Sequence, residues 1–183
     1  MLHRWMLILM VSVSMAAMAA GDRVGLYDFD NEPTNYDERL GTSWVELDTQ
    51  VKSLPKEEDL TELPLDLLPK NIRMYGDLEN IDINDQDYVT RLWLVARSKH
   101  GAYNGSYEGF RCATEQYKGY AHASLVRSQP LRVVEFPRWR PARQGSYRME
   151  LMKTILCDDT RQHPLNIVID NLDRHANSYE PPS

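Results

Sequence analysis

Cysteine is scarce in this sequence, which holds only Cys112 and Cys157 among 183 residues. The chain has no C-x-x-C pair, and no cysteine and histidine lie at zinc-finger spacing, so a zinc finger is excluded. It also has no apolar run of about 20 residues, the length that a membrane-spanning helix needs. No catalytic or cofactor-binding motif stands out, and we assign no catalytic residue, no metal site and no cofactor from the sequence.

The first 20 residues have the layout of a cleavable secretory signal peptide. A short basic region ends at Arg4, an apolar core runs from Trp5 to Met15, and Ala16–Ala20 offers the small residues of an A-x-A cleavage site. The alternative, an uncleaved membrane anchor, is disfavoured because the apolar segment is too short. We therefore expect an exported protein with no membrane span after signal cleavage.

Export places the two cysteines in an oxidising compartment. An even number of cysteines in such a compartment predicts one disulfide, between Cys112 and Cys157. Two free thiols, or half of a metal site, are the alternatives. The mature chain of about 160 residues is the size of one domain and buries a core without several cross-links.

Charge is unevenly distributed along the mature chain. Residues 21–89 hold 18 acidic and 6 basic side chains, whereas residues 90–183 hold 9 acidic and 14 basic ones. One interpretation is that an acidic segment wraps a basic sheet domain, and the other is that the basic face docks an acidic partner. Nucleic acid is disfavoured as a partner because the chain is exported and has a net charge of −6.

The order of the sequence patterns predicts an α+β fold. An acidic segment at residues 21–43, which we expect to be mobile, precedes an ordered, extended coil around Trp44 and residues 60–68. Four later stretches have the β-branched and aromatic content of strands, which predicts an antiparallel sheet of about four strands. These stretches are Ile72–Tyr75, Tyr88–Ser98, Ser106–Ala121 and Leu131–Phe136. Along Tyr88–Ser98, alternation places Val89, Arg91, Trp93, Val95 and Arg97 on one face and Tyr88, Leu92, Leu94 and Ala96 on the other.

Turns and helices complete the prediction. Asn104–Gly105 has the residues of a hairpin turn, and Ser98–Gly101 is the alternative position for it. One helix is predicted over Tyr147–Leu156 with Ser146 as its cap, and another after Pro164. We expect these one or two C-terminal helices to pack on the sheet, within one globular domain at residues 44–174 that a polar tail at 175–183 follows.

Arginine is concentrated near the predicted helices, at Arg132, Arg138, Arg140, Arg143 and Arg148. Guanidinium groups next to an aromatic ring suit carboxylate or phosphate ligands, so the cluster is a candidate site for an acidic protein, a peptide or an envelope component. The alternative is that these arginines pair with the acidic N-terminal segment. The candidate binding residues are Arg132, Arg138, Trp139, Arg140 and Arg143.

Two arrangements that resemble catalytic or metal sites are weak. Ser106 lies in a G-S-x-x-G sequence rather than in the G-x-S-x-G of a nucleophile elbow, and it enters a strand instead of a helix. Asp158, Asp159 and His163 lie close together in the sequence, but a metal would need a further fixed ligand. We interpret this stretch as a solvated connector.

The stretch from Gly101 to Cys112 reads G-A-Y-N-G-S-Y-E-G-F-R-C. With Trp139 and the helix ending at Leu156-Cys157, it resembles the CNP-one-like (CNP1-like) family, an uncharacterised group of exported proteins of Gram-negative bacteria. The resemblance covers residues 44–172 and implies a periplasmic location and pairing of the two cysteines. It implies no catalytic residues.

Within this motif, Glu108 and Arg111 form either a structural ion pair or part of a site, and we favour the structural role. Two hypotheses on function follow. The first is a non-enzymatic periplasmic module that binds through its sheet face and the arginine cluster. The second is a small periplasmic hydrolase that uses Glu108, His122 or Asp159. The sequence leaves open whether the protein is an enzyme, and we favour the binding module.

Overall fold

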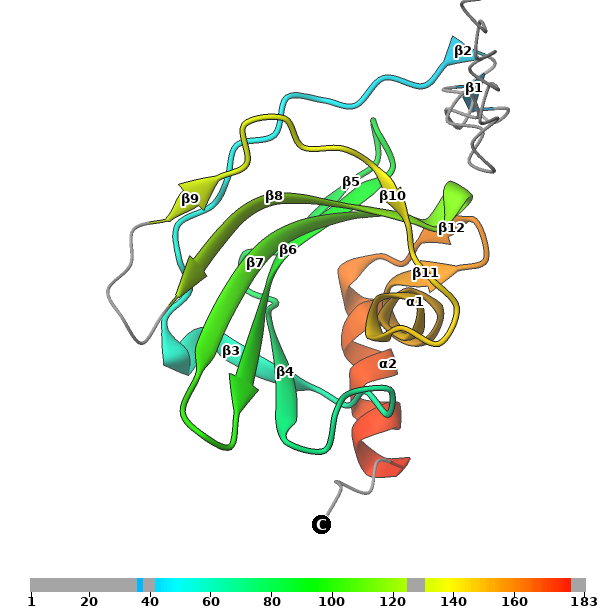
Figure 1. The fold of residues 1–183 in the computed structure, drawn as a ribbon. Helices are drawn as coiled ribbons and strands as arrows, with labels where there is room; N and C mark the ends of the chain where they lie inside the picture. Colours follow the sequence, from blue (N-terminus) through cyan, green and yellow to red (C-terminus); the bar gives the residue numbers. More distant parts are fainter. Residues whose placement is uncertain (1–35, 38–41, 125–130, 179–183) are drawn as a thin grey trace, which may run out of the picture. The chain divides into compact units, whose positions relative to one another are not determined.

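The computed structural model describes residues 36–37, 42–124 and 131–178. Its main element is an antiparallel sheet centred on the long strands β6 (Val89–Ser98), β7 (Tyr103–Arg111) and β8 (Gln116–Ser124). Shorter strands extend it: β3 (Leu60–Leu63), β4 (Ile72–Asp77), β5 (Asp82–Asn84), β9 (Arg132–Val133) and β10 (Arg140–Pro141). The order across the sheet is β10, β8, β7, β6, β4, β3, with β5 beside β6 and β9 beside β8 (Figure 1).

The antiparallel sheet and the C-terminal helices agree with the expected α+β fold, but the expected number of about four strands was too small. The missed strands have only two to four residues each, too few to show an alternating pattern. One of them, β3, lies in the segment that we expected to be coil. The leader at residues 1–20 and nearly all of the segment at 21–43 lie outside the described residues, apart from the paired β1 (Tyr36–Asp37) and β2 (Thr42–Ser43).

The first central hairpin turns at the alternative position. The N–H of Ser98 donates to the carbonyl of Ala102 at 2.9 Å, and Gly101 has a φ of 82°, a value that glycine adopts without strain. Asn104–Gly105, the other position that the sequence offered, lies inside β7, where Gly105 is buried between Val95 and Ala123 in register. The hydrogen-bonded pairing of β7 with β6 and β8 is thus stronger than the local turn preference of these two residues.

The predicted single strand Ser106–Ala121 is wrong, because it folds into two strands of a second hairpin. β7 ends at Arg111, a 3₁₀ turn follows at η2 (Cys112–Thr114), and Glu115 takes a φ of 49° before β8 begins. Cys112 is therefore the first residue of a turn rather than a strand residue. The predicted strand Leu131–Phe136 is likewise reduced to β9, since Pro137 and exposed residues follow it.

The helices begin where the sequence predicts. The hydroxyl of Ser146 accepts the N–H of Met149 at 3.4 Å and caps α1 (Tyr147–Leu151), which continues directly as the π-helix η3 (Met152–Leu156). A short hairpin of β11 (Cys157–Asp158) and β12 (Arg161–Gln162) leads to α2 (Leu165–Ser178). Of the tail expected at residues 175–183, residues 175–178 form the last turn of α2, and the others lie outside the described residues.

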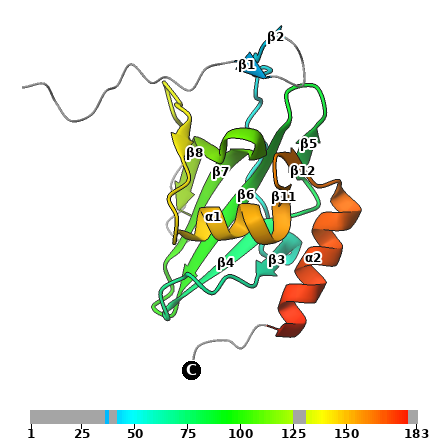
Figure 2. The same ribbon diagram turned by 90° about the vertical axis from the view of Figure 1, so that its right-hand side faces the viewer.

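Each face of the sheet has its own apolar core. Leu92 and Leu94 of β6 point to the main core beneath α1, η3 and α2, whereas Trp93 points to a second core on the opposite face. This alternation along β6 is the one that the sequence predicts. Figures 1 and 2 show the helices on one face, with α1 lying across the strands, while an extended N-terminal segment follows the other face.

We call this extended segment, residues 44–54, the strap. Val51 and Leu54 of the strap pack on the second core, which also contains Tyr107 and Tyr120. The indole N–H of Trp44 donates to the main-chain carbonyl of Asp87 at 2.7 Å, and that of Trp93 donates to the carbonyl of Lys52 at 3.1 Å. Apolar contacts and hydrogen bonds therefore both fix the strap on the sheet.

A buried network of charges joins the strap to β6 and β8. Arg91 and Asp87, whose side chains are 3% and 0% exposed, form an ion pair, and Asp87 also accepts the N–H of Leu47 at 3.1 Å. Burial by itself lowers the pKa of Arg91, but the hydrogen bond to Asp87 and nearby charges outweigh it and raise the pKa. Glu46 accepts from Lys118 Nζ and from the Tyr120 hydroxyl, each at 2.6 Å.

The disulfide between Cys112 and Cys157 is present, as predicted, with its Cα atoms 5.7 Å apart. It joins the turn between β7 and β8 to the residue that follows η3, so it ties the sheet to the helical layer. Both cysteines belong to the main core. Among the described residues no cysteine is free.

Replacing both cysteines, as Cys112→Ser with Cys157→Ser, should lower the free energy of unfolding by about 2–4 kcal/mol, because the bond closes a long loop in the unfolded chain. The sequence separation between the two is 45 residues. Urea unfolding of the variant and of the native protein measures the difference. Two alkylatable thiols in the native protein, seen by intact mass without reductant, would contradict the bond itself.

Candidate functional site

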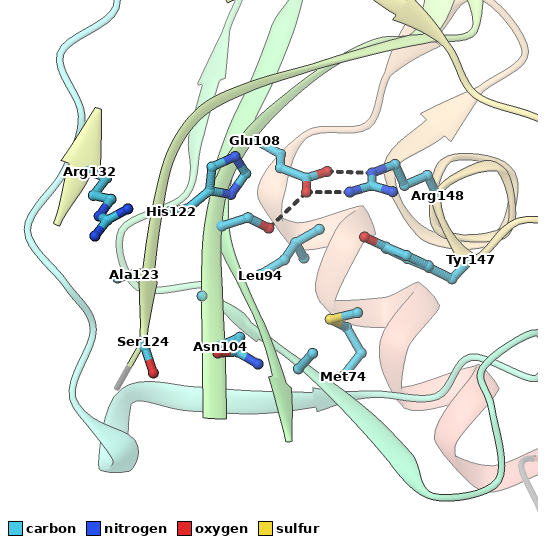
Figure 3. Close-up of a pocket in the computed structure, with 13 residues that line it drawn as sticks. Met74, Leu94, Asn104, Glu108, His122, Ala123, Ser124, Arg132, Tyr147 and Arg148 are labelled. Atoms are coloured by element: carbon cyan, nitrogen blue, oxygen red, sulfur yellow. Dashed lines mark hydrogen bonds and ion pairs between the residues drawn. The ribbon is translucent and has the colours of Figure 1, made fainter. Parts of the chain in front are cut away.

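A pocket of about 440 Å³ opens between the sheet and the start of α1 (Figure 3). Its floor consists of the apolar side chains of Met74 in β4 and of Leu94 and Ala96 in β6, and polar side chains surround this floor. Gly105 and Ala123 also line the pocket, but Gly105 has no side chain and that of Ala123 packs in the second core on the other face of the sheet. The polar residues are Asn104, Ser106, Glu108, His122, Ser124, Arg132, Tyr147 and Arg148.

A fixed ion pair forms the wall nearest to α1. Arg148 donates from Nε to Oε2 of Glu108 and from Nη2 to Oε1, each at 2.7 Å, a bidentate pair. The hydroxyl of Ser106 donates to Oε1 of Glu108, also at 2.7 Å. The Glu108 side chain is 1% exposed and that of Arg148 is 25% exposed, so the pair joins the buried sheet to the partly open pocket.

Two tyrosines hold the guanidinium of Arg148. It lies 4.2 Å from the ring centroid of Tyr117 and 4.6 Å from that of Tyr147. Burial alone lowers the pKa of Arg148, but the hydrogen bonds and charge of Glu108 outweigh it and raise the pKa. Burial, followed by the negative charge of Glu108, raises the pKa of Tyr147, so its phenol stays neutral at physiological pH.

The far side of the pocket comes from cross-strand neighbours. Ser106 of β7 lies directly opposite His122 of β8, and His122 lies opposite Arg132 of β9. Side chains at paired positions point to the same face of a sheet, so these three residues line up from the pocket to its edge. Of the three, His122 and Arg132 are exposed. The pocket therefore has a neutralised ion pair on one side and solvent-accessible nitrogen groups on the other.

The structure brings some of the candidate residues together and separates others. Glu108 and His122 line the same pocket, but Arg111 lies on the opposite face of the sheet, with its guanidinium 3.9 Å from the ring centroid of Trp44. Glu108 is paired with Arg148 rather than with Arg111, because residues three apart on a strand face opposite sides. Asp159 lines a separate pocket beside the disulfide.

The arrangement of Ser106, His122 and Glu108 differs from that of a serine hydrolase. In such enzymes a histidine accepts the serine proton and an acid orients that histidine. Here the acid bonds directly to Ser106, and its other contacts go to Arg148. Within the described part of the chain, no group of three or more histidine, cysteine, aspartate or glutamate side chains is placed to hold a metal ion. The helices of these residues also lack the length and apolar character that a membrane span requires.

The predicted arginine cluster divides into separate groups. Arg132 lines the pocket. Trp139 belongs to the strap side, where its indole N–H donates to Glu46 Oε2 at 3.0 Å and its ring meets that of Trp44 edge-on. Arg138, Arg140 and Arg143 are exposed, and no ion pair within the described ranges involves them.

Arg148 belongs to the arginine run but was not among the candidate binding residues, and Tyr147 had no assigned role. One feature of the sequence points to Arg148. Glu108 lies two residues before Phe110 and so shares a strand face with this apolar ring, and a carboxylate that is buried beside it needs a cationic partner. Arg148, in the first turn of the predicted helix, is a partner that could reach it.

The sequence model of the CNP1-like family matches residues 39–172, more than half of the chain. The chain belongs to the CNP1-like family. A search of curated proteins found no match, and a search of solved structures found none either. The family resemblance seen in the Gly101–Cys112 motif is thus confirmed, and its function has to be argued from the site itself.

The motif residues of this family member divide between the two faces of β7. Ser106 and Glu108 point to the pocket and to Arg148, whereas Tyr107 points to the second core beneath the strap. Gly109 also faces the strap, and a Cβ atom on it would lie 2.6 Å from the hydroxyl of Tyr120, so any other residue type would require the Tyr120 ring to move. One strand therefore supplies both the pocket wall and the seat of the strap.

Removing the cation alone should be worse than removing the whole ion pair. Arg148→Met leaves the buried Glu108 charge uncompensated and should lower the free energy of unfolding by about 3–5 kcal/mol. The double variant Glu108→Leu with Arg148→Met should lower it by less, because no buried charge remains. Urea unfolding of both variants measures this, and a double variant less stable than Arg148→Met would contradict the prediction.

Proposed function

We propose that this protein is a non-catalytic binding module, exported to the periplasm, whose ligand site is the pocket between the sheet and α1. The observation that carries the proposal is the division of the pocket into an apolar floor and a polar surround. Ligand sites in proteins combine these two properties, the apolar part for affinity and a few placed polar groups for orientation.

The polar groups favour binding over hydrolysis. Glu108 accepts hydrogen bonds from Arg148 and Ser106, so its oxygens are already occupied by protein donors. The hydroxyl of Ser106 is directed to that carboxylate and is not activated by a histidine. Groups held in this way keep the shape of a pocket and orient a ligand, but they are poor proton acceptors for a reaction.

The ligand class follows from the charge of the accessible side. Arg132 is exposed at the pocket edge, and no ion pair in the described part of the chain engages it. A guanidinium with free donors binds carboxylate or phosphate oxygens. The apolar floor, with Leu94 and Ala96, suits a short hydrocarbon group. We therefore propose a small organic anion with an apolar body, such as an envelope-derived carboxylate or a peptide end.

Octanoate serves as a probe for this pocket in calorimetric titration. We expect it to bind more tightly than acetate, which lacks the apolar chain, and than octanol, which lacks the charge. Arg132→Glu should weaken octanoate binding by about tenfold or more, equal to about 1.4 kcal/mol. Ala96→Phe, which fills the floor, should also weaken it.

Arg138→Glu is the matched control, because Arg138 is exposed in the same segment and does not line the pocket. Octanoate binding that equals acetate binding, or that falls equally in the two charge-reversal variants, would rule out the pocket as the site. The second outcome would instead favour the exposed arginines Arg138, Arg140 and Arg143 as a docking surface for an acidic partner.

The periplasmic location rests on the leader at residues 1–20 and is supported by the disulfide. Cell fractionation of a Gram-negative host expressing the full chain should recover a mature protein from the periplasm. Its N-terminal sequence should begin at Ala20 or Gly21, after cleavage following Ala19 or Ala20. Recovery of the uncleaved chain from the cytosol, with both thiols reduced, would contradict export.

A further inference from the structure

A second pocket, of about 370 Å³, lies at the end of the sheet where β4 begins and β6 ends. In Figure 1 this region is at the lower end of β4, next to the turn that connects β6 and β7. Four of the side chains that line it are cationic, and none of its described lining residues is acidic. The four are Lys70, Arg73, Arg97 and Lys99.

Two of these cations are placed directly opposite each other. Arg73 of β4 is the register partner of Arg97 of β6. Like charges at opposite positions of an antiparallel pair repel each other and destabilise the pairing. Arg73 is bound by Glu62 and Arg97 by Glu57 at 3.0 Å, and these two pairs reduce the repulsion.

Both of these ion pairs are at the surface and can be exchanged. The side chains of Arg97 and Glu57 are 52% and 69% exposed, and those of Arg73 and Glu62 are 46% and 41% exposed. Exposed pairs of this kind contribute only about 0–1 kcal/mol each. An anion in the pocket can therefore replace a glutamate as the partner of a guanidinium with little loss of folding stability.

The backbone around the pocket is held in place. The N–H of Lys99 donates to the carbonyl of Asn71 at 3.0 Å, and the N–H of Ile72 donates to the carbonyl of Pro69 at 2.8 Å. These bonds tie the segment with Lys70 to the segment with Lys99. Neither lysine takes part in an ion pair within the described ranges of the chain. The two lysines are thus held near the arginine pair and keep their charges available.

We infer that this pocket is a binding site for a phosphate group carrying two negative charges. Counted together, the four cations and the carboxylates of Glu57 and Glu62 carry a net charge of +2. A phosphomonoester dianion has the matching charge and three acceptor oxygens for guanidinium and ammonium donors. The site is separate from the pocket proposed for the organic anion, and the two share no lining residue.

The source of the phosphate is a soluble phosphomonoester or the headgroup of a lipid, and the experiment distinguishes them. Calorimetric titration of the mature protein with inorganic phosphate and with glycerol 3-phosphate measures the soluble form. Sedimentation with phosphatidic acid vesicles, against phosphatidylcholine vesicles, measures the lipid form. We expect inorganic phosphate to bind more tightly than acetate and its affinity to fall with added salt.

The test variant is Arg97→Gln with Lys99→Gln, and its matched control is Arg138→Gln with Arg140→Gln. Each removes two positive charges two residues apart from an exposed segment. We expect the test variant to bind phosphate at least about tenfold more weakly and the control to bind as the native protein does. Circular dichroism and the urea midpoint verify that both variants fold.

Each outcome decides the proposal. Phosphate binding that is lost only in the test variant supports it, and the vesicle arm then tells whether the lipid headgroup or the soluble ester is preferred. No phosphate binding by the native protein overturns it. Equal weakening in both variants also overturns it, since the binding would then reflect overall charge.

Discussion

The side chain of Arg91 is only 3% exposed in the middle of a sheet face, and its charge has to be balanced there. A buried guanidinium without a partner would cost several kcal/mol, so the fold supplies Asp87 as an ion-pair partner and Thr49 as a further acceptor at 2.9 Å. Asp82 of β5 lies 3.6 Å away and Glu46 lies 3.8 Å away, and both add negative charge. Thr49 and Glu46 belong to the strap, so the strap completes the set of acceptors around Arg91 that Asp87 and Asp82 begin.

The strap in turn determines what the sheet can expose. Trp93, Tyr107 and Tyr120 are nearly fully buried on the face beneath the strap, and they would be in water without it. Glu46 reaches Lys118, Tyr120 and Trp139, so one carboxylate connects β8, the segment before β10 and the strap. With this face closed, the opposite face carries the helices and the pocket.

β7 transmits this arrangement from one face to the other. Its side chains alternate, so Tyr107, Gly109 and Arg111 face the strap while Ser106 and Glu108 face the pocket. Gly109 has no Cβ, which leaves room for the ring of Tyr120 and its hydrogen bond to Glu46. A shift of the strand by one residue would exchange the two sets of side chains. Glu108 would then face away from Arg148, and Arg111 would face away from Trp44.

The sequence was informative where one regular period governs a segment, and uninformative where two local preferences compete. The alternation along β6 and the helix after Ser146 are strong, uninterrupted patterns, and both were predicted correctly. Asn104–Gly105 has the residues of a turn, but there the ladder with β6 and β8 is the stronger interaction. The local pattern of residues does not contain information about such long-range pairing.

The prediction for Ser106–Ala121 also failed because local alternation does not show how the strands pair. The register between β7 and β8 shifts at Tyr107 and Glu108, which leaves Tyr120 as an extra residue on β8. Tyr120 and Ala121 therefore face the same core, although alternation predicts opposite faces. The partner of Glu108 was missed because the pair with Arg148 joins residues 40 positions apart, and only the packing of α1 on the sheet brings them together.

The charge asymmetry of the chain acquires a specific meaning from these contacts. Glu46 and Glu57 of the acidic half pair with Lys118 and Arg97 of the basic half, so part of the asymmetry is balanced internally, as one of the two interpretations required. The pairing is incomplete, however. Within the described residues, Arg132, Lys70 and Lys99 take part in no ion pair, and each of them lines a pocket. Cations that internal acids do not neutralise, held at the edge of a hollow, are the places where an external anion gains most, so these residues connect the folding of this domain to its binding of ligands.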